Sequence, residues 1–321
     1  MMSGWSLGMQ IGSSARLFSL ALGLWSASGT PADGYPGAYA DCPGVVVSTK
    51  TGETLTFDVL AERVRDAGVV LFGEVHGVPE HARASACLLS MLAEGGRPAG
   101  LVVEILSVDD QPVVDRYRRE NPENAAGLGV VLQWWKRGWP AFEHWLALFD
   151  RAFSLRIDIK GGDAGEGSVS SPEPWLGGHL TAVRASWASA MKRAHCELID
   201  SKEAARLGEQ QIMRDLSMAE RAIALHTRLA ARSKTDPAVL VHAGRGHVRK
   251  DRSLFHALMQ QADAKPGKIV VIGAFSAVDA KAMRETDEFD FVWVAGGPSV
   301  MQVNCPFGIG RKAERAAEQS R

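Results

Sequence analysis

Val69-Val-Leu-Phe-Gly-Glu-Val-His-Gly77 is an apolar run that passes directly into two glycines enclosing a glutamate and a histidine. Short apolar runs rich in β-branched residues are typical of strands that are buried on both faces. Glycine adopts backbone angles that other residues resist, so Gly73 and Gly77 can turn Glu74 and His76 away from the strand. The stretch therefore predicts a buried strand that ends in a polar loop.

Four further runs of the same kind follow, at residues 101–103, 239–241, 269–272 and 291–294, with helical stretches between them. This alternation predicts right-handed βαβ crossovers and therefore an α/β fold, in which a mainly parallel sheet is covered by helices on both faces. The long interval at about 107–235 predicts a helical insertion or subdomain, with one more strand at 155–159 and a helix at 202–232.

The N-terminal part of the chain predicts export. Residues 17–25 form an apolar run that is too short to span a bilayer, which needs about 20 residues, but that suits a secretory signal peptide over residues 1–29. A leader at 30–44 precedes a domain at 45–305, and residues 306–321 predict a frayed tail. The domain would open with a hairpin at 45–49 and 54–57, followed by a helix from Asp58 to Asp66. We expect a periplasmic or secreted protein without a transmembrane segment.

Composition narrows the function classes. The 321 residues are 46% hydrophobic and 23% charged, which excludes coiled-coil, collagen-like and disordered chains. The formal net charge is −1 and the basic residues are scattered along the sequence, so nucleic acid is not an expected partner.

The four cysteines, Cys42, Cys87, Cys196 and Cys305, lack the spacing of a thiolate metal site. Export would permit disulfides, but the sequence does not indicate which cysteines pair. Cys87 lies on an apolar helical stripe, which favours a plain core residue.

Polar residues follow three of the predicted strands. The first strand delivers Glu74 and His76, the second runs into Glu104, and the third runs into a glycine-rich loop that carries His247. Because ligands bind beyond the carboxyl ends of parallel strands, we expect these four side chains to form one site. Histidine and carboxylate together suit a divalent metal, a general base or an axial position on haem iron.

Two further features bear on this site. Pro79 predicts the first turn of a helix that begins near His81. His81 could reach back toward His76, but a surface position is favoured. Gln211 and Arg214 lie on the apolar face of the helix at 202–232. A buried arginine needs a partner, so Arg214 predicts an ion pair with Glu74, Glu104 or Asp215, or a bound anion; the pair could also be purely structural.

The segment at 133–145 holds four tryptophans together with His144. It could form the wall of a pocket for a flat aromatic ligand, a partner surface, or the core where the helical insertion meets the sheet. The last interpretation is slightly favoured. Trp135, Trp139 and His144 are the candidate ligand-contacting residues of this segment.

Several motifs together resemble the ChaN-like haem-binding proteins, an iron-regulated lipoprotein-type family of the Tiki superfamily, which is related to erythromycin esterases and Tiki-type metalloproteases. The motifs are Leu71-Phe-Gly-Glu-Val-His76, Pro79-Glu-His81, Val102-Val-Glu104, Trp134-Trp-Lys-Arg-Gly-Trp-Pro140, Ala194-His-Cys196, Gln211-Ile-Met-Arg-Asp215 with Met218-Ala219, and Gly244-Arg-Gly-His-Val-Arg-Lys-Asp251. In order and spacing they cover most of the chain from about Thr51 to Val294.

The resemblance implies an exported haem-binding protein of iron acquisition that forms a homodimer around its cofactor. The cofactor-binding residues it implies are His76, Trp135, Trp139, His144, Arg214 and Tyr117. Two features depart from the family. No lipobox cysteine follows the apolar run at 17–25, which argues against a lipid anchor. The family resemblance implies a tyrosine ligand near the Trp-rich segment, whereas the only tyrosine after the leader is Tyr117. The axial ligand is therefore open among His76, His144, His195 and Tyr117.

A hydrolase is the alternative function, and the sequence leaves open whether the protein is an enzyme. By resemblance to the hydrolase branches, His76, His247, Glu104 and Glu74 would carry an esterase or peptidase reaction, either directly or with a divalent metal held by His76, Glu104 and His247. Two carboxylates in one crevice should raise one pKa unless a cation such as Arg214 intervenes. A Trp-rich segment lying over the cluster would favour the flat ligand.

Overall fold

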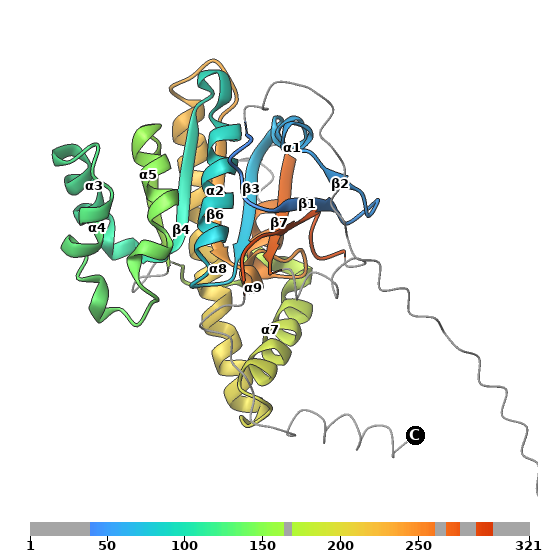
Figure 1. The fold of residues 1–321 in the computed structure, drawn as a ribbon. Coiled ribbons are helices and arrows are strands. Elements are labelled where there is room, and N and C mark those ends of the chain that lie inside the picture. The colour runs from blue at the N-terminus through green and yellow to red at the C-terminus, as the bar shows by residue number, and fades with distance from the viewer. Residues whose placement is uncertain (1–38, 164–168, 261–267, 277–286, 298–321) are drawn as a thin grey trace, which may run out of the picture. The chain divides into compact units, whose positions relative to one another are not determined.

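The computed structural model describes residues 39–163, 169–260, 268–276 and 287–297, which belong to one compact unit, Pro36–Arg321. Its centre is an eight-stranded sheet in the order β2-β1-β8-β7-β3-β6-β4-β5 (Figure 1). The predicted signal peptide at 1–29, most of the leader and the tail at 306–321 lie outside the described residues.

The middle of the sheet is parallel, as predicted. The strands are β3 (Ala67–Glu74), β4 (Ala99–Ser107), β5 (Asp158–Asp163), β6 (Ala238–Gly244), β7 (Lys268–Phe275) and β8 (Phe291–Val294). The predicted hairpin is β1 (Val45–Ser48) and β2 (Thr54–Leu55), and it adds antiparallel strands at the β8 edge. Each apolar run of the sequence lies inside one of these strands.

Helices cover both faces of the sheet (Figure 1). They are α1 (Phe57–Val64), α2 (Pro79–Leu92), α3 (Gln111–Glu120), α4 (Ala126–Val131), α5 (Leu146–Ser154), α6 (Glu173–Leu176), α7 (Leu180–Ala194), α8 (Ser201–Ala230), α9 (Arg245–Val248) and α10 (Ser253–Gln260). Successive strand residues point to opposite faces. Val70 and Phe72 pack in the layer of α1, α2 and α5, whereas Val69 and Leu71 pack in the layer of α7, α8 and α10. This arrangement confirms the predicted α/β class.

Two boundaries differ from the sequence prediction. Thr56, and not Asp58, caps α1, because its side chain accepts a hydrogen bond from the Val59 N–H. The strand predicted at 155–159 begins only at Asp158, because Arg156 takes a positive φ of 54° as the chain leaves α5.

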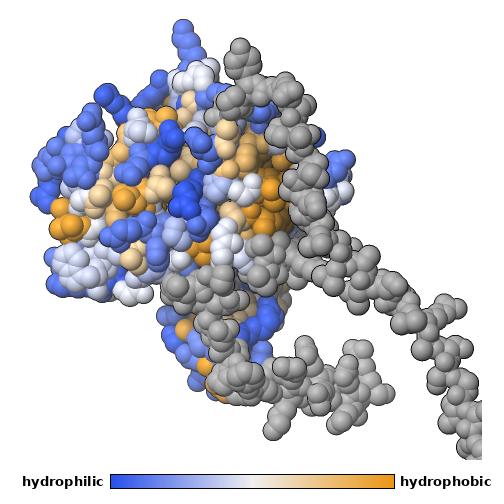
Figure 2. All heavy atoms as spheres, viewed as in Figure 1, coloured by the Kyte–Doolittle hydropathy of each residue, from blue (hydrophilic) through white to orange (hydrophobic). Residues whose placement is uncertain are grey.

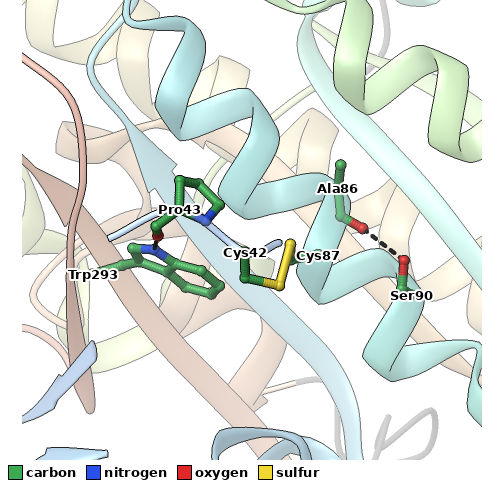
Figure 3. Close-up of a disulfide and its surroundings, with 6 residues drawn as sticks. All are labelled: Cys42, Pro43, Ala86, Cys87, Ser90 and Trp293. Carbon is green, nitrogen blue, oxygen red and sulfur yellow. Dashed lines mark hydrogen bonds between the residues drawn. A yellow bond between two sulfur atoms is a disulfide. The ribbon is translucent and has the colours of Figure 1, made fainter. Parts of the chain in front are cut away.

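A disulfide between Cys42 and Cys87 joins the segment before β1 to α2 (Figure 3). The Trp293 indole N–H donates to the Pro43 carbonyl at 2.7 Å, so this segment is also tied to β8. The expectation that Cys87 is a plain core residue was therefore wrong, because a helical stripe indicates burial but not what the buried sulfur faces. Cys196 is disulfide-bonded as well.

The outer edge of β5 is covered by a side chain. The Gln111 amide donates to the Ile159 carbonyl at 3.0 Å and accepts from the Gly161 N–H at 3.0 Å. The side-chain amide thus makes the two hydrogen bonds that a neighbouring strand would otherwise make.

The surface around these elements is mixed. Figure 2 shows hydrophilic side chains over much of the face formed by α3 and α5, with smaller hydrophobic groups among them. Within the described ranges, none of the helices combines the length and apolarity that crossing a membrane requires.

Candidate functional site

The candidate site lies where β3, β4 and β6 end. β3 and β6 run in parallel register, so that Glu74, the last residue of β3, pairs with Gly244, the last residue of β6. Their carboxyl ends therefore open at one edge of the sheet, as the sequence predicted. The structure brings together Glu74, His76, Glu104 and His247 at this edge.

Glu74 is buried and meets three nitrogen atoms. Its Oε1 accepts from the Trp145 indole N–H at 2.7 Å and lies 2.8 Å from His76 Nδ1, while its Oε2 lies 3.2 Å from His242 Nε2. Burial alone would raise the pKa of Glu74. The facing His242 and His76 have the larger, opposite effect, so the pKa of Glu74 lies well below its ordinary value. Glu74 is therefore a carboxylate at neutral pH.

The sequence suggested that Glu104 follows the second strand. In the structure Glu104 lies inside that strand, β4. The pairing of β4 with β5 shifts register between Val103 and Ser107, and such irregularities re-aim side chains. Glu104 Oε2 accepts from the Gly244 N–H at 2.6 Å, and Oε1 accepts from Arg214 at 2.8 Å. The predicted ion pair of Arg214 is therefore present, and Arg214 also donates to Asp163 at 2.8 Å.

His247 lies between two carboxylates. Its Nδ1 is 2.6 Å from Asp215 Oδ1, and its Nε2 is 3.2 Å from Glu104 Oε1. Burial lowers the pKa of His247, but Glu104 and Asp215 outweigh it and raise the pKa to about 10. Burial likewise raises the pKa of Glu104, and His247 reverses this and holds it well below the usual range.

The predicted repulsion between the two carboxylates is thus absent. The pKa of both Glu74 and Glu104 is lowered, because histidines face each carboxylate and Arg214 pairs with Glu104. The sequence analysis predicted a raised pKa unless a cation lay nearby, and Arg214 and His247 are such cations.

Residues of α10 and α7 hydrogen-bond to Asp215. Its Oδ2 accepts from the Ser253 hydroxyl and from the Trp187 indole N–H at 3.3 Å. The Trp187 ring lies 5.0 Å from the His247 ring, and the buried Arg252 guanidinium lies 4.3 Å from the Trp187 ring centre on a second side. These contacts fix the orientation of His247.

His76 is the cluster residue whose side chain reaches the surface, with 22% of it exposed. Its Nε2 lies 3.9 Å from Glu104 Oε2, and its ring packs edge-on against Trp139 with centroids 5.0 Å apart. Burial lowers the pKa of His76, but the hydrogen bond and charge of Glu74 raise it overall. An imidazole held by a buried carboxylate through Nδ1 presents Nε2 to iron, so His76 fits an axial ligand by its chemistry.

Gly244 allows this close approach. A Cβ at this position would lie 3.0 Å from His76 Nε2 and 3.3 Å from Glu104 Oε2. Any larger residue would have to displace the imidazole or the carboxylate.

The Trp-rich segment serves both the core and the site. Trp134 and Trp145 are buried in the core, and Trp145 also holds Glu74. Trp139 lies beside His76, so the segment borders the cluster, which is the position that favours a flat ligand. Trp135 is 69% exposed.

Two of the remaining candidates lie in other parts of the fold, and the third lies in the Trp-rich segment. Tyr117 is buried in α3, where its hydroxyl donates to the Asn124 carbonyl at 2.8 Å and its ring packs near Phe153. His195 is exposed at the end of α7, with Nδ1 2.8 Å from the Met191 carbonyl. His144 follows Trp139 along the segment, and its Nδ1 is buried without a hydrogen-bond partner in the described part of the chain.

Two histidines of the site were missed. His81 was expected on the surface but is fully buried, because the Val75 N–H donates to its Nδ1 and the Ala295 carbonyl faces its Nε2. His242 lies in β6 on the same face as Leu240, with Nδ1 3.0 Å from the Ser85 hydroxyl. A histidine at a core-facing strand position was the signal that could have identified it.

The divalent metal of the alternative interpretation finds no support. Among residues 39–163, 169–260, 268–276 and 287–297, no three His, Cys, Asp or Glu side chains are arranged to hold a metal ion. The physical reason is that the Gly244 N–H, Arg214 and His247 already surround the oxygens of Glu104.

Comparison with known proteins agrees with the α/β fold. The fold is similar to that of ChaN of Campylobacter jejuni, a structure of cofacial heme binding, with a TM-score of 0.61 and 17% identity over 79% of this chain and 98% of that one. Weaker likenesses are to the type III effector HopBA1 (TM-score 0.44, 15% identity, 75% and 93% covered) and to an erythromycin esterase, EreC, in its open conformation (0.38, 12%, 80% and 84%). No curated protein sequence matches. The family model of haem-binding uptake proteins, Tiki superfamily, ChaN, matches residues 60–172 and 168–258, and the chain belongs to this family.

Proposed function

We propose that the protein binds haem at the carboxyl ends of β3, β4 and β6, beside the Trp-rich segment. The observation that carries the proposal is the contact between Trp139 and His76, whose ring centroids lie 5.0 Å apart. Flat cofactors are held by aromatic walls with a few oriented polar groups, and this pair supplies one of each. Membership of the haem-binding family supports the same ligand.

In this proposal each residue has a separate role. His76 would hold the iron through Nε2, with Glu74 fixing its ring, and Trp139 would contact the flat cofactor. Arg214 offers its remaining N–H groups to a haem propionate. His144, whose Nδ1 lacks a partner in the described residues, and the exposed Trp135 are further candidate contacts from the Trp-rich segment, while Tyr117 and His195 rank behind His76 as ligands. Bound haem would supply an iron with an axial position that an imidazole can fill.

The setting of this function is export for iron or haem acquisition, with two copies of the chain around the cofactor. The disulfide between Cys42 and Cys87 supports an oxidising compartment such as the periplasm, because such bonds are rare in the cytosol. Gel filtration with and without haem would test the homodimer.

A visible-spectrum haem titration of the full chain tests the proposal. We expect a saturable Soret shift that is weakened in His76→Ala and Trp139→Ala and unchanged in His195→Ala, whose exposed ring lies on α7. An equal effect of His195→Ala, or no saturable shift in the unchanged protein, would overturn it.

The alternative function is a hydrolase that uses the same residues. With its pKa raised to about 10, His247 is an imidazolium at neutral pH, which suits stabilising a developing oxyanion and not accepting a proton. Hydrolysis would therefore need Glu74 or His76 to activate water. An esterase and peptidase screen of the haem-free protein, with Glu74→Gln as control, separates this function from haem binding.

A further inference from the structure

A cavity of about 520 Å³ lies at the amino end of β5, at the opposite end of the sheet from the histidine–carboxylate cluster. Six of its lining residues are basic. They are Arg118, Arg119, Arg156, Lys160, Arg228 and Arg232. This is a local concentration of positive charge in a chain whose formal net charge is −1.

The basic residues come from separate parts of the sequence. Arg118 and Arg119 end α3, Arg156 precedes β5, and Arg228 lies in the last turn of α8. The sequence suggested scattered charge because these positions are far apart along the chain. The fold gathers them around one cavity.

Two carboxylates of the cavity neutralise only part of this charge. Asp158 pairs with Arg228 at 2.9 Å and faces Arg118 at 3.9 Å, and Asp115 lies 3.5 Å from Lys160. Arg119, Arg156 and Arg232 make no ion pair with a carboxylate of the described residues. A positive surplus therefore faces the cavity.

Buried N–H groups without hydrogen-bond acceptors also favour a bound anion at this place. The Arg228 Nε is buried and has no hydrogen-bond partner in the described part of the chain, and the same holds for the Arg221 Nε. Arg221 lines an adjoining cavity of about 270 Å³ that shares Lys160 and Arg228 with the first. A buried N–H group without an acceptor is unfavourable, so an oxyanion acceptor at this place would be stabilising.

The backbone at Arg156 adds an independent observation. This arginine holds a φ of 54°, in the left-handed region that a residue with a Cβ rarely enters. Such strain persists where the surrounding structure imposes it, and here it turns the chain so that Arg156 lines the cavity.

We propose that this cavity binds a multivalent phosphate-bearing anion, independently of the haem site. Guanidinium groups present paired N–H donors that match phosphate oxygens, and several arginines around one cavity suit a ligand with more than one negative charge. The phosphate belongs either to a small soluble molecule or to a lipid headgroup.

Calorimetric titration of the full chain with inorganic tripolyphosphate at low salt, about 50 mM, tests the site where screening is weak. The variant Arg119→Glu with Arg232→Glu reverses two exposed charges of the cavity and cancels much of its surplus. The matched control, Arg63→Glu with Lys202→Glu, makes the same change of net charge on α1 and at the start of α8. We expect saturable binding that the first pair weakens about tenfold or more and that the control leaves within about twofold.

A further variant guards against misfolding. Arg156→Gly removes one charge but suits the positive φ, so it should weaken tripolyphosphate binding while the fold becomes no less stable. Absence of binding to the unchanged protein, or equal weakening by the control pair, would overturn the proposal. Co-sedimentation with phosphatidylglycerol vesicles, against phosphatidylcholine vesicles, then identifies the source. If the protein sediments with the phosphatidylglycerol vesicles and tripolyphosphate releases it, the ligand is a lipid headgroup. If the protein does not sediment with the vesicles, the ligand is a soluble phosphate.

Discussion

His247 Nδ1 lies 2.6 Å from Asp215 Oδ1, so the short helix after β6 is tied to the middle of α8 at the floor of the candidate site. Removing the charge of Asp215 should leave a buried imidazolium with one partner fewer. For Asp215→Asn we expect a loss of about 3 kcal/mol in the free energy of unfolding, measured by urea denaturation. The exposed Asp109→Asn is the control and should change stability by less than about 0.5 kcal/mol.

The same pair predicts a pH dependence of stability. Because the pKa of His247 rises from 6.5 in the unfolded chain to about 10 in the folded one, its contribution is complete below pH 6.5 and is lost as the pH rises through 10. The difference in unfolding free energy between the unchanged protein and His247→Gln should therefore shrink steadily over this window. A difference that grew with pH would contradict the assignment.

Haem binding should depend on pH through His76. The hydrogen bond to Glu74 raises the pKa of His76 against the effect of burial, so iron would compete with a proton that is held more tightly than on a free histidine. We expect the affinity in a Soret titration to rise with pH until His76 is deprotonated. In His76→Ala the residual affinity should lose this slope, which distinguishes ligation by His76 from ligation by His144.

Gly244 and Gly246 form a matched pair for testing the geometry. A Cβ on Gly244 would lie 3.0 Å from His76 Nε2, whereas one on Gly246 meets nothing nearer than Trp187 at 3.8 Å. We expect Gly244→Ala to lower haem affinity about tenfold or more through the displaced imidazole, and Gly246→Ala to leave it unchanged. Equal effects of the two variants on affinity would place the ligand elsewhere.

The disulfide between Cys42 and Cys87 should contribute to stability. It closes a loop with a sequence separation of 45 residues, for which chain-entropy arguments give about 4 kcal/mol. We expect Cys42→Ser with Cys87→Ser to lose most of this amount in urea unfolding, with the haem affinity little altered because the bond joins the segment before β1 to α2 and neither cysteine is a residue of the candidate site. Reductant should destabilise the unchanged protein, and it should affect this double variant less.

Much of the fold could be predicted because local patterns determine it. Strands buried on both faces leave continuous apolar runs, and the residues at their carboxyl ends, such as Glu74 and His247, follow from the parallel arrangement. Arg214 could be matched to a carboxylate because a buried guanidinium requires one.

What could not be predicted depends on contacts between distant segments. His81 looked like a surface residue of a first helical turn, but it fills the space under Ala295, 214 positions further along the chain. Trp145 donates to Glu74 across 71 positions, which no local pattern encodes. Glu104 lies in the stretch of β4 where the register against β5 shifts, and no local pattern encodes how two strands pair.

The amide of Gln111 at the edge of β5 has a consequence for how the protein behaves at high concentration. An open outer strand would offer its N–H and C=O groups to a strand of another molecule, which is a common start of aggregation. With the Ile159 carbonyl and the Gly161 N–H already bonded, this border of the sheet is closed to such stacking. A single side chain thereby favours solubility. We expect Gln111→Ala to increase aggregation, measured by turbidity and thioflavin fluorescence, under conditions in which ligand binding is still unchanged.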